Sequence, residues 1–377
     1  MKVMAEPETE TRKSPTGTPQ LEPTYEGDFV LEEPLLLDSG RLLAGLTLHY
    51  AVYGRLTAAR DNAVLVCHAL TGSALVGSWW PEIFGPGGVL SLENDFVICI
   101  NMLGSCYGST GPGSVDPETG RVYGPDFPLV SVRDNVRAQA KLLDSLGIRC
   151  LRLVLGGSLG GMQALEWAIV FPDRVERSVV IGVAPLSAMG LALNHLQRQA
   201  IQHDPDWAEG RYLPHKQPRR GLSLARQIGM MSYKSAELFN ERFGRKPNRN
   251  GEDPWGLDNQ GGGLIGGRFD IAGYLDHQGE RFIERFDANA YLAILRTMDT
   301  WDPLHGNASP APIFGRILAR LTFVGISSGW LFPPQEVREF AHAIRAAGVQ
   351  AEYREMASGH GHDAFLAEQA ELLRLLQ

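Results

Sequence analysis

Ser158 is the residue of this sequence best placed for nucleophilic chemistry. It stands in Gly156-Gly-Ser-Leu-Gly160, a G-x-S-x-G pattern, between an apolar run at 151–155 and a helical pattern at 160–171. Glycines on both sides permit a sharp turn that pushes the serine side chain clear, and the N-terminus of the following helix favours negative charge. A glycine-rich loop that binds phosphate or merely turns is the alternative, but the flanking strand and helix favour a nucleophile.

A serine hydroxyl needs a general base, and a candidate lies near the C-terminus. The segment Ser358-Gly-His-Gly-His-Asp363 falls between a predicted strand and the predicted last helix. Chains with this strand, serine and helix arrangement place their histidine last, after the nucleophile and the acid. We therefore predict His362 as the base, with His360 as its competitor.

Acyl transfer also requires hydrogen-bond donors aimed at the developing oxyanion. The backbone N–H of Leu159, the residue after the nucleophile, is one expected donor. The second is expected from the loop after an early strand, His68-Ala-Leu-Thr-Gly72. We assign it to the backbone N–H of Leu70.

The elements that must position these residues follow a regular alternation. Short continuous apolar runs, typical of strands buried on both faces, alternate with amphipathic helical patterns, and an antiparallel ribbon is expected at 29–53. The strands are predicted at 62–67, 96–100, 151–155, 178–182, 321–326 and 351–356, and the helices at 131–147, 160–171, 334–347 and 363–376. This alternation predicts an α/β fold with a mostly parallel central sheet flanked by helices.

The alternation is interrupted near Pro185, and a mostly helical region with Gly/Pro/Asn-rich loops follows. We predict a core over 23–185 and 313–377, into which a helical lid over 186–312 is inserted. Residues 1–22 are rich in Glu, Thr, Pro and Lys without apolar periodicity, which predicts a disordered arm.

The composition of the chain argues against several classes of function. A net charge of −8 among 377 residues argues against a polyanion as partner. There is no run of about 18 apolar residues and no secretory pattern at the N-terminus, so we expect neither a membrane span nor export. The chain has only 4 cysteines, without a C-x-x-C pair, which favours reduced thiols and a cytoplasmic protein. The close pair His360 and His362 lacks a third ligand, so no metal site is predicted.

A series of segments in fixed order carries a wider resemblance. They are His68–Gly72, Asn101–Pro112, Tyr123–Pro128, Arg133–Gln139, Gly156–Trp167, Arg285–Tyr291, Trp330–Pro333 and Gly361–Leu366. Together they resemble the homoserine O-acetyltransferases of the α/β-hydrolase fold, over nearly the whole chain after about residue 25.

The resemblance implies a two-step transfer, in which Ser158 takes the acyl group of an acyl-coenzyme A and L-homoserine then receives it for methionine synthesis. Acetyl-CoA is the expected cosubstrate, and no permanently bound cofactor is expected. The family closes its site with a helical lid that also forms a homodimer contact. In the family a lid arginine holds the substrate carboxylate, which points to Arg226 with Tyr233 as a weaker companion, and Asp363 would bind the ammonium. The alternatives are a surface arginine and a helix N-terminal acid.

One position departs from the family pattern. The triad carboxylate belongs in a Ser-Asp-x-Leu-Phe-like segment, but this chain has glycine at position 329, in Ser327-Ser-Gly-Trp-Leu-Phe332. Ser328 and Glu336 are the nearest substitutes, and neither is a clear one. The alternatives that stay open are a serine acceptor, a succinyl donor, an ester hydrolase, and a catalytically weak binding protein.

Overall fold

The computed structural model describes residues 21–84, 88–249, 254–255, 267–307 and 309–377. In these ranges the core is an eight-stranded sheet with the order β1-β4-β6-β5-β7-β8-β9-β10. β1 (Tyr25–Leu31) pairs antiparallel with β4 (Leu46–Gly54), and β4 pairs antiparallel with β6. The remaining six strands, in the order β6-β5-β7-β8-β9-β10, run parallel to one another. The parallel strands are β5 (Ala63–Cys67), β6 (Phe96–Ile100), β7 (Leu153–Gly157), β8 (Arg177–Ile181), β9 (Arg320–Ile326) and β10 (Ala351–Met356). The predicted mostly parallel sheet is confirmed, and a small pair of strands, β2 (Leu35–Leu36) and β3 (Leu42–Leu43), lies beside it.

Apolar layers cover both faces of the sheet, which explains the continuous apolar runs of the central strands. Every residue of β5, β6 and β7 is buried. One layer packs against α2 (Val132–Ser145), α3 (Leu159–Val170) and α10 (Pro334–Ala346), and the other against α1 (Val76–Trp79) and α12 (Gln369–Leu376). The strands therefore lie between two sets of helices, as parallel strands must.

Some helix ends are set by capping residues that can be recognised in the sequence, and others are not. Ser131 caps α2 and forms a capping box with Asp134, at the start of the predicted helix over 131–147. The predicted single helix over 363–376 is wrong, because Glu368 leaves the helical region (φ −121°, ψ 56°) and separates α11 (Ala364–Ala367) from α12. Short 3-10 turns occupy Pro81–Ile83, Gly124–Asp126, Pro172–Arg174, Pro205–Gly210 and Pro214–Lys216.

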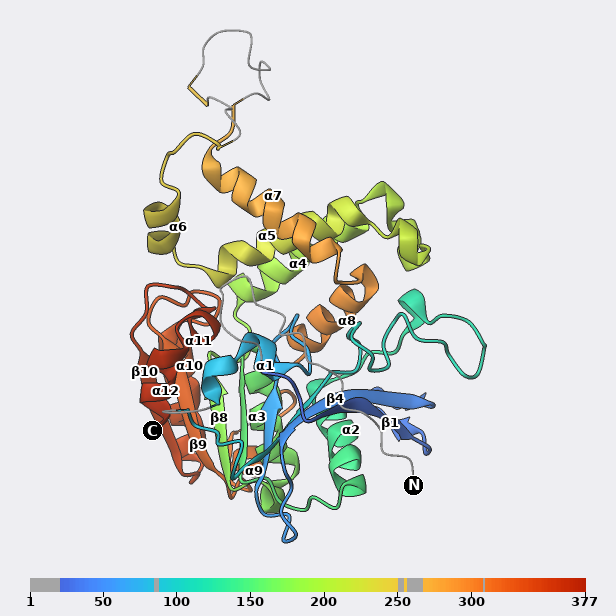
Figure 1. Cartoon of the computed structure of the whole chain (residues 1–377), viewed down its shortest axis with the longest axis vertical. Coiled ribbons are helices and arrows are strands. Elements are labelled where there is room, and N and C mark those ends of the chain that lie inside the picture. Colours follow the sequence, from blue (N-terminus) through green and yellow to red (C-terminus); the bar gives the residue numbers. More distant parts are fainter. Residues whose placement is uncertain (1–20, 85–87, 250–253, 256–266, 308) are drawn as a thin grey trace, which may run out of the picture.

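Between β8 and β9 the chain leaves the sheet and forms a helical layer. Its helices are α4 (Ala188–Gln202), α5 (Arg219–Tyr233), α6 (Ala236–Arg242), α7 (Asp270–Ile283) and α8 (Ala288–Asp299). α5 packs between α4 and α7, and the three lie across the end of the sheet at which its parallel strands finish (Figure 1). The chain returns to β9 through α9 (Ala311–Phe314). The limits 186 and 312 stay a prediction, and the loop at 259–263 and nearly all of the arm at 1–22 lie outside the described residues.

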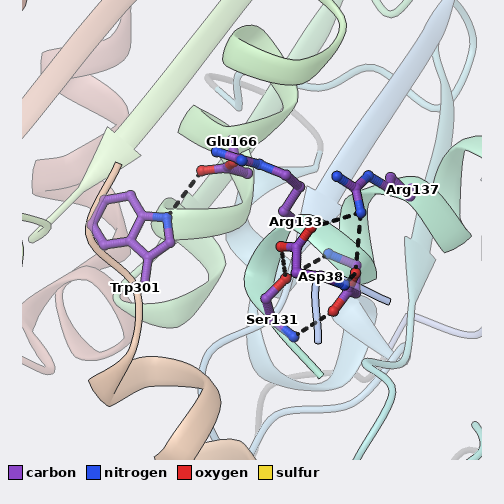
Figure 2. A network of polar contacts seen from close by, with 7 residues as sticks. Asp38, Ser131, Arg133, Arg137, Glu166 and Trp301 are labelled. Atoms are coloured by element: carbon purple, nitrogen blue, oxygen red, sulfur yellow. Dashed lines mark hydrogen bonds and ion pairs between the residues drawn. The ribbon is translucent and has the colours of Figure 1, made fainter. Parts of the chain in front are cut away.

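A polar network fixes α3, the helix that follows the serine, against its neighbours (Figure 2). Arg133 Nε donates to Glu166 Oε1 at 2.7 Å, and Trp301 Nε1 donates to Glu166 Oε2 at 3.1 Å. Arg137 also pairs with Asp38 at 2.7 Å. The network therefore ties α2 and α3 to the segment that returns from the helical layer. Among the helices of the described ranges, none is long and apolar enough to cross a membrane.

Candidate active site

Ser158 occupies a strained turn between β7 and α3. Its backbone has φ 57° and ψ −128°, a conformation that is rare for a residue with a side chain. Its N–H donates to the carbonyl oxygen of Ile181 at 2.8 Å, and its own carbonyl accepts from Met162 at 3.0 Å. The neighbouring strand and helix thus stabilise this strained backbone, and the whole residue is only 6% exposed.

The glycines beside the serine are needed for close approach. A Cβ at position 160 would lie 2.1 Å from the carbonyl oxygen of Cys67, and one at position 156 would lie 2.7 Å from the same atom. Both distances are shorter than real contacts allow, so the end of β5 packs directly on the backbone of the turn. This packing brings the loop after β5 beside Ser158.

That loop carries Leu70, one of the two predicted oxyanion donors, and is fixed by a buried histidine. His68 Nδ1 bonds to the carbonyl oxygen of Ala69 at 2.8 Å, and His68 Nε2 accepts from the N–H of Met102 at 3.2 Å. Burial lowers the pKa of His68 to about 4, so the ring is neutral and Nδ1 is the donor. The N–H groups of Leu70 and Leu159 donate to no described residue, which leaves both free for an oxyanion.

His362 lies in an apolar environment on the same cavity as Ser158. Its ring contacts Phe332 and Phe365, at centroid distances of 5.3 and 5.8 Å. Burial lowers the pKa of His362 to about 4, while the charge of Asp363 acts to raise it and that of Lys234 to lower it. In the part of the chain that the structure describes, Nε2 is buried without a hydrogen-bond partner. The imidazole is therefore neutral, and the rings of Phe332 and Phe365 pack against it.

His360, the predicted competitor, does not line the cavity. Its Nε2 lies 3.0 Å from Lys234 Nζ, and its Nδ1 lies 3.9 Å from Glu368 Oε1. Burial and the charge of Lys234 lower its pKa. Of the two histidines, the structure brings only His362 to the cavity of Ser158.

Glycine 329 lies in a turn after β9, and no carboxylate of that turn or of any other described segment bonds to the imidazole of His362. The N–H of Gly329 donates to the carbonyl oxygen of Ile326 at 2.9 Å. Ser328 Oγ accepts from the N–H of Gly361 at 2.9 Å, so it holds the histidine loop through its backbone. Within the described ranges, neither Ser328 nor Glu336 bonds to the imidazole.

The helical layer contributes a cation to the cavity. Arg226 on α5 makes no ion pair with any described residue, and its guanidinium lies over the rings of Tyr233 and Phe282 at 5.4 and 5.1 Å. Tyr233 is partly buried beside it, and its desolvation raises the pKa of its phenol. An unpaired guanidinium beside a nucleophile is suited to bind a carboxylate of a substrate.

Asp363 is already paired with Lys234, a contact that the sequence did not predict. Lys234 Nζ lies 3.2 Å from Asp363 Oδ2, and the N–H of Asp363 donates to the carbonyl oxygen of Tyr233 at 3.0 Å. Ser235 Oγ also donates to the carbonyl oxygen of Gly359. These contacts dock the end of α5 on the histidine loop and leave Asp363 Oδ1 without a partner among the described atoms.

These residues meet in a small cavity of about 90 Å³ between the sheet and the helical layer. The predicted residues that line it are Leu70, Ser158, Arg226, Tyr233, His362 and Asp363. Leu159 adjoins Ser158 but faces the core. Sequence reasoning missed Asn194 and Gln197, which line the cavity from α4. Two buried amides three residues apart on a helix are the signal that could have found them.

No group of three His, Cys, Asp or Glu side chains could hold a metal ion among the residues that the structure places. The arrangement of Ser158, His362 and the two free backbone N–H groups is suited to nucleophilic attack by a serine, with a histidine as base and two donors for an oxyanion.

Comparison with known proteins adds three findings. The family model described as alpha/beta hydrolase fold matches residues 62–369. A homoserine O-acetyltransferase of Symbiobacterium thermophilum is 49% identical, over 89% of each chain, and a homoserine O-succinyltransferase of Halothiobacillus neapolitanus is 44% identical, over 89% of this chain and 84% of its own. The crystal structure of homoserine O-acetyltransferase from Bacillus anthracis superposes with a TM-score of 0.86 at 24% identity, covering 94% of this chain and 97% of the other.

The burial of His362 predicts a loss of stability on mild acidification. Its pKa is about 4 in the folded chain, against 6.5 for an exposed histidine, so only the unfolded chain takes up this proton between those values. The contribution of His362 to stability is therefore full above pH 6.5 and falls as the pH drops, by about 2 kcal/mol at pH 5. Urea unfolding at pH 7 and pH 5 should show a loss that is smaller by about that amount in His362→Gln. The exposed control His203→Gln should lose as much as the parent, and an equal loss in all three proteins would contradict the buried, neutral state.

Proposed function

The chain belongs to the homoserine O-acetyltransferase family of the α/β-hydrolase fold, and it is an acyltransferase. From this we propose that it transfers the acetyl group of acetyl-CoA to the hydroxyl of L-homoserine through an acyl-Ser158 intermediate. The observation that carries the proposal is the shared cavity, in which a serine nucleophile, a neutral histidine and an unpaired arginine meet.

The first half-reaction acylates the serine. His362 takes the proton of Ser158 as Oγ attacks the thioester carbonyl, and the N–H groups of Leu70 and Leu159 stabilise the oxyanion. When the tetrahedral intermediate collapses, the C–S bond breaks, and the imidazolium of His362 returns its proton to the thiolate of coenzyme A. A neutral histidine is ready for this step at pH 7, because its pKa is about 4.

The second half-reaction runs through the same groups in reverse order. The hydroxyl of homoserine gives its proton to His362 and attacks the ester carbonyl. The ester bond to Ser158 Oγ then breaks, and the imidazolium reprotonates that oxygen, which releases O-acetyl-L-homoserine.

Acceptor recognition is assigned to charges on both sides of the cavity. Arg226 would hold the acceptor carboxylate through its planar fork. Asp363 would take the ammonium on Oδ1, because Lys234 occupies Oδ2. This arrangement fits any small α-amino acid with a hydroxyl group, so serine is the alternative acceptor. The 44% identical succinyltransferase makes succinyl-CoA the alternative donor.

The absence of a triad carboxylate at position 329 lowers the expected rate of the reaction but does not change its type. A triad acid fixes the tautomer of its histidine and stabilises the imidazolium, and its loss costs roughly 10⁴ in kcat in serine proteases. Here the rings of Phe332 and Phe365 hold the orientation, but they supply no negative charge. We therefore propose an attenuated transferase.

We further propose that the protein is a cytoplasmic homodimer that supplies methionine synthesis. The support for the dimer is an exposed apolar surface on the helical layer. Its members are Met189, Leu191 and Leu196 on α4, and Leu224 and Met231 on α5. Soluble monomers rarely leave so many large apolar side chains exposed on adjacent helices.

A product assay tests the proposed reaction. With acetyl-CoA and homoserine, the chain should release coenzyme A and form O-acetyl-L-homoserine in equal amounts, detected by mass spectrometry. Ser158→Ala should abolish both, because the attacking oxygen is removed. Parallel assays with serine, with succinyl-CoA and without acceptor separate the sister transferases and the ester hydrolase. Near-native turnover by Ser158→Ala would disprove the acyl-enzyme route.

Glycine 329 gives the second test. Gly329→Asp should raise kcat at least tenfold and at most about 10⁴-fold, with little change in the KM for homoserine, because the carboxylate acts on the imidazolium of the transition state. The position does not require a left-handed backbone, and a Cβ there would lie 3.1 Å from the Ile326 carbonyl oxygen, so a small local shift is needed.

Gly329→Ala is the matched control, since it adds the same Cβ without the charge. A folded Gly329→Asp that is no faster than Gly329→Ala would contradict the proposal that the lost carboxylate limits the rate. It would then follow that another group already supports His362, or that the chain is a binding protein.

A further inference from the structure

A basic hollow lies at the end of the sheet opposite the serine. It has a volume of about 640 Å³ and is formed where β8, β9 and β10 begin and where α10 ends. Three arginines line it, Arg177, Arg320 and Arg345, together with one carboxylate, Glu352. The cavity of Ser158 follows the finishing ends of the parallel strands, so the two sites share no residue.

The parallel register brings two of these cations together. Arg177 begins β8, Arg320 begins β9, and the two residues are direct partners across the strands. Neighbouring strands lie about 4.8 Å apart, so both side chains leave the sheet from adjacent points. Like charges that lie directly opposite in a sheet repel each other, so this pair is unfavourable without an anion.

The three arginines lack ion-pair partners within the described ranges, although Glu352 shares the hollow with them. Arg177, Arg320 and Arg345 form no ion pair with any described carboxylate, and the last two are exposed. Glu352 is engaged elsewhere, because its Oε1 accepts from Thr322 Oγ1 at 2.9 Å and pairs with Arg354 at 3.0 Å. A concentration of positive charge in a chain with a net charge of −8 is therefore left for a ligand.

We propose that this hollow binds a phosphate-bearing anion through the guanidinium groups of Arg177, Arg320 and Arg345. Guanidinium forks match the tetrahedral oxygens of phosphate in a bidentate manner, and a cluster of them prefers a multivalent anion to chloride. The volume leaves room for more than one phosphate group, so free phosphate, pyrophosphate and a nucleoside monophosphate are the sources that an experiment must distinguish.

Two strands, β9 and β10, connect the hollow to the loops beside the active site. β9 runs from Arg320 to Ile326, directly before the turn that holds glycine 329. β10 runs from the hollow to Met356, a few residues before the loop of His362. The two strands that begin at the hollow therefore end next to the loops of Gly329 and His362.

Titration of the full chain in phosphate-free, low-salt buffer tests the site. Phosphate, pyrophosphate and AMP are added separately, binding is measured by calorimetry and the melting temperature by scanning calorimetry, and NaCl of equal ionic strength is the blank. The parent chain should bind at least one of the three saturably, and its melting temperature should rise by about 2 °C or more beyond the NaCl blank. Arg320→Gln and Arg177→Gln should each weaken binding at least tenfold.

The same variants separate a binding role from a structural one. In the absence of phosphate, each should melt at or above the temperature of the parent, because the repulsion between the paired cations is removed. Arg121→Gln, an exposed arginine in the loop between β6 and α2, should change neither quantity. No saturable binding beyond the NaCl blank, equal weakening by Arg121→Gln, or variants that melt lower without phosphate would each overturn the proposal.

Discussion

The close approach of the end of β5 to the turn between β7 and α3 is the contact on which the site depends. The Cys67 carbonyl oxygen lies so near the backbone of that turn that any side chain at positions 156 and 160 would overlap it. The packing holds Ser158 at positive φ and brings the loop of Leu70 beside it. The nucleophile and both proposed oxyanion donors therefore depend on a contact between backbones, and the buried strands on each side stabilise its strain.

The rest of the site lies along the same edge of the sheet. It combines apolar packing around His362 with an ion pair beside it. Phe332 and Phe365 hold the imidazole of His362 in surroundings that keep it neutral, while the docked end of α5 brings Lys234 against Asp363. A neutral base suits proton abstraction. The same burial penalises the imidazolium that each half-reaction must form, and glycine 329 supplies no charge to offset this cost.

Local signals made much of this predictable from the sequence. The turn that holds Ser158, the buried strands and the capping box of Ser131 and Asp134 each depend on a few neighbouring residues. The break at Glu368, the pair of Lys234 with Asp363 and the amides of α4 in the cavity were missed. The last two depend on packing between distant segments. The arginine hollow was missed for the same reason, since the strand register brings together residues 143 positions apart in the chain. The roles of Arg226, Tyr233 and Asp363 rested on family resemblance, and the structure adds that they line one cavity with Ser158.

The central claim is that His362 serves as a neutral base without a carboxylate behind it, and the pH dependence of Ser158 acylation tests it most directly. Rapid mixing with acetyl-CoA, followed by the release of the free thiol, gives the acylation rate constant between pH 5 and pH 8. With a His362 pKa of about 4, the rate constant should stay nearly flat over this range. A rate constant that falls to half near pH 6.5 or above would contradict the account, because it would show that a negative charge stabilises the imidazolium.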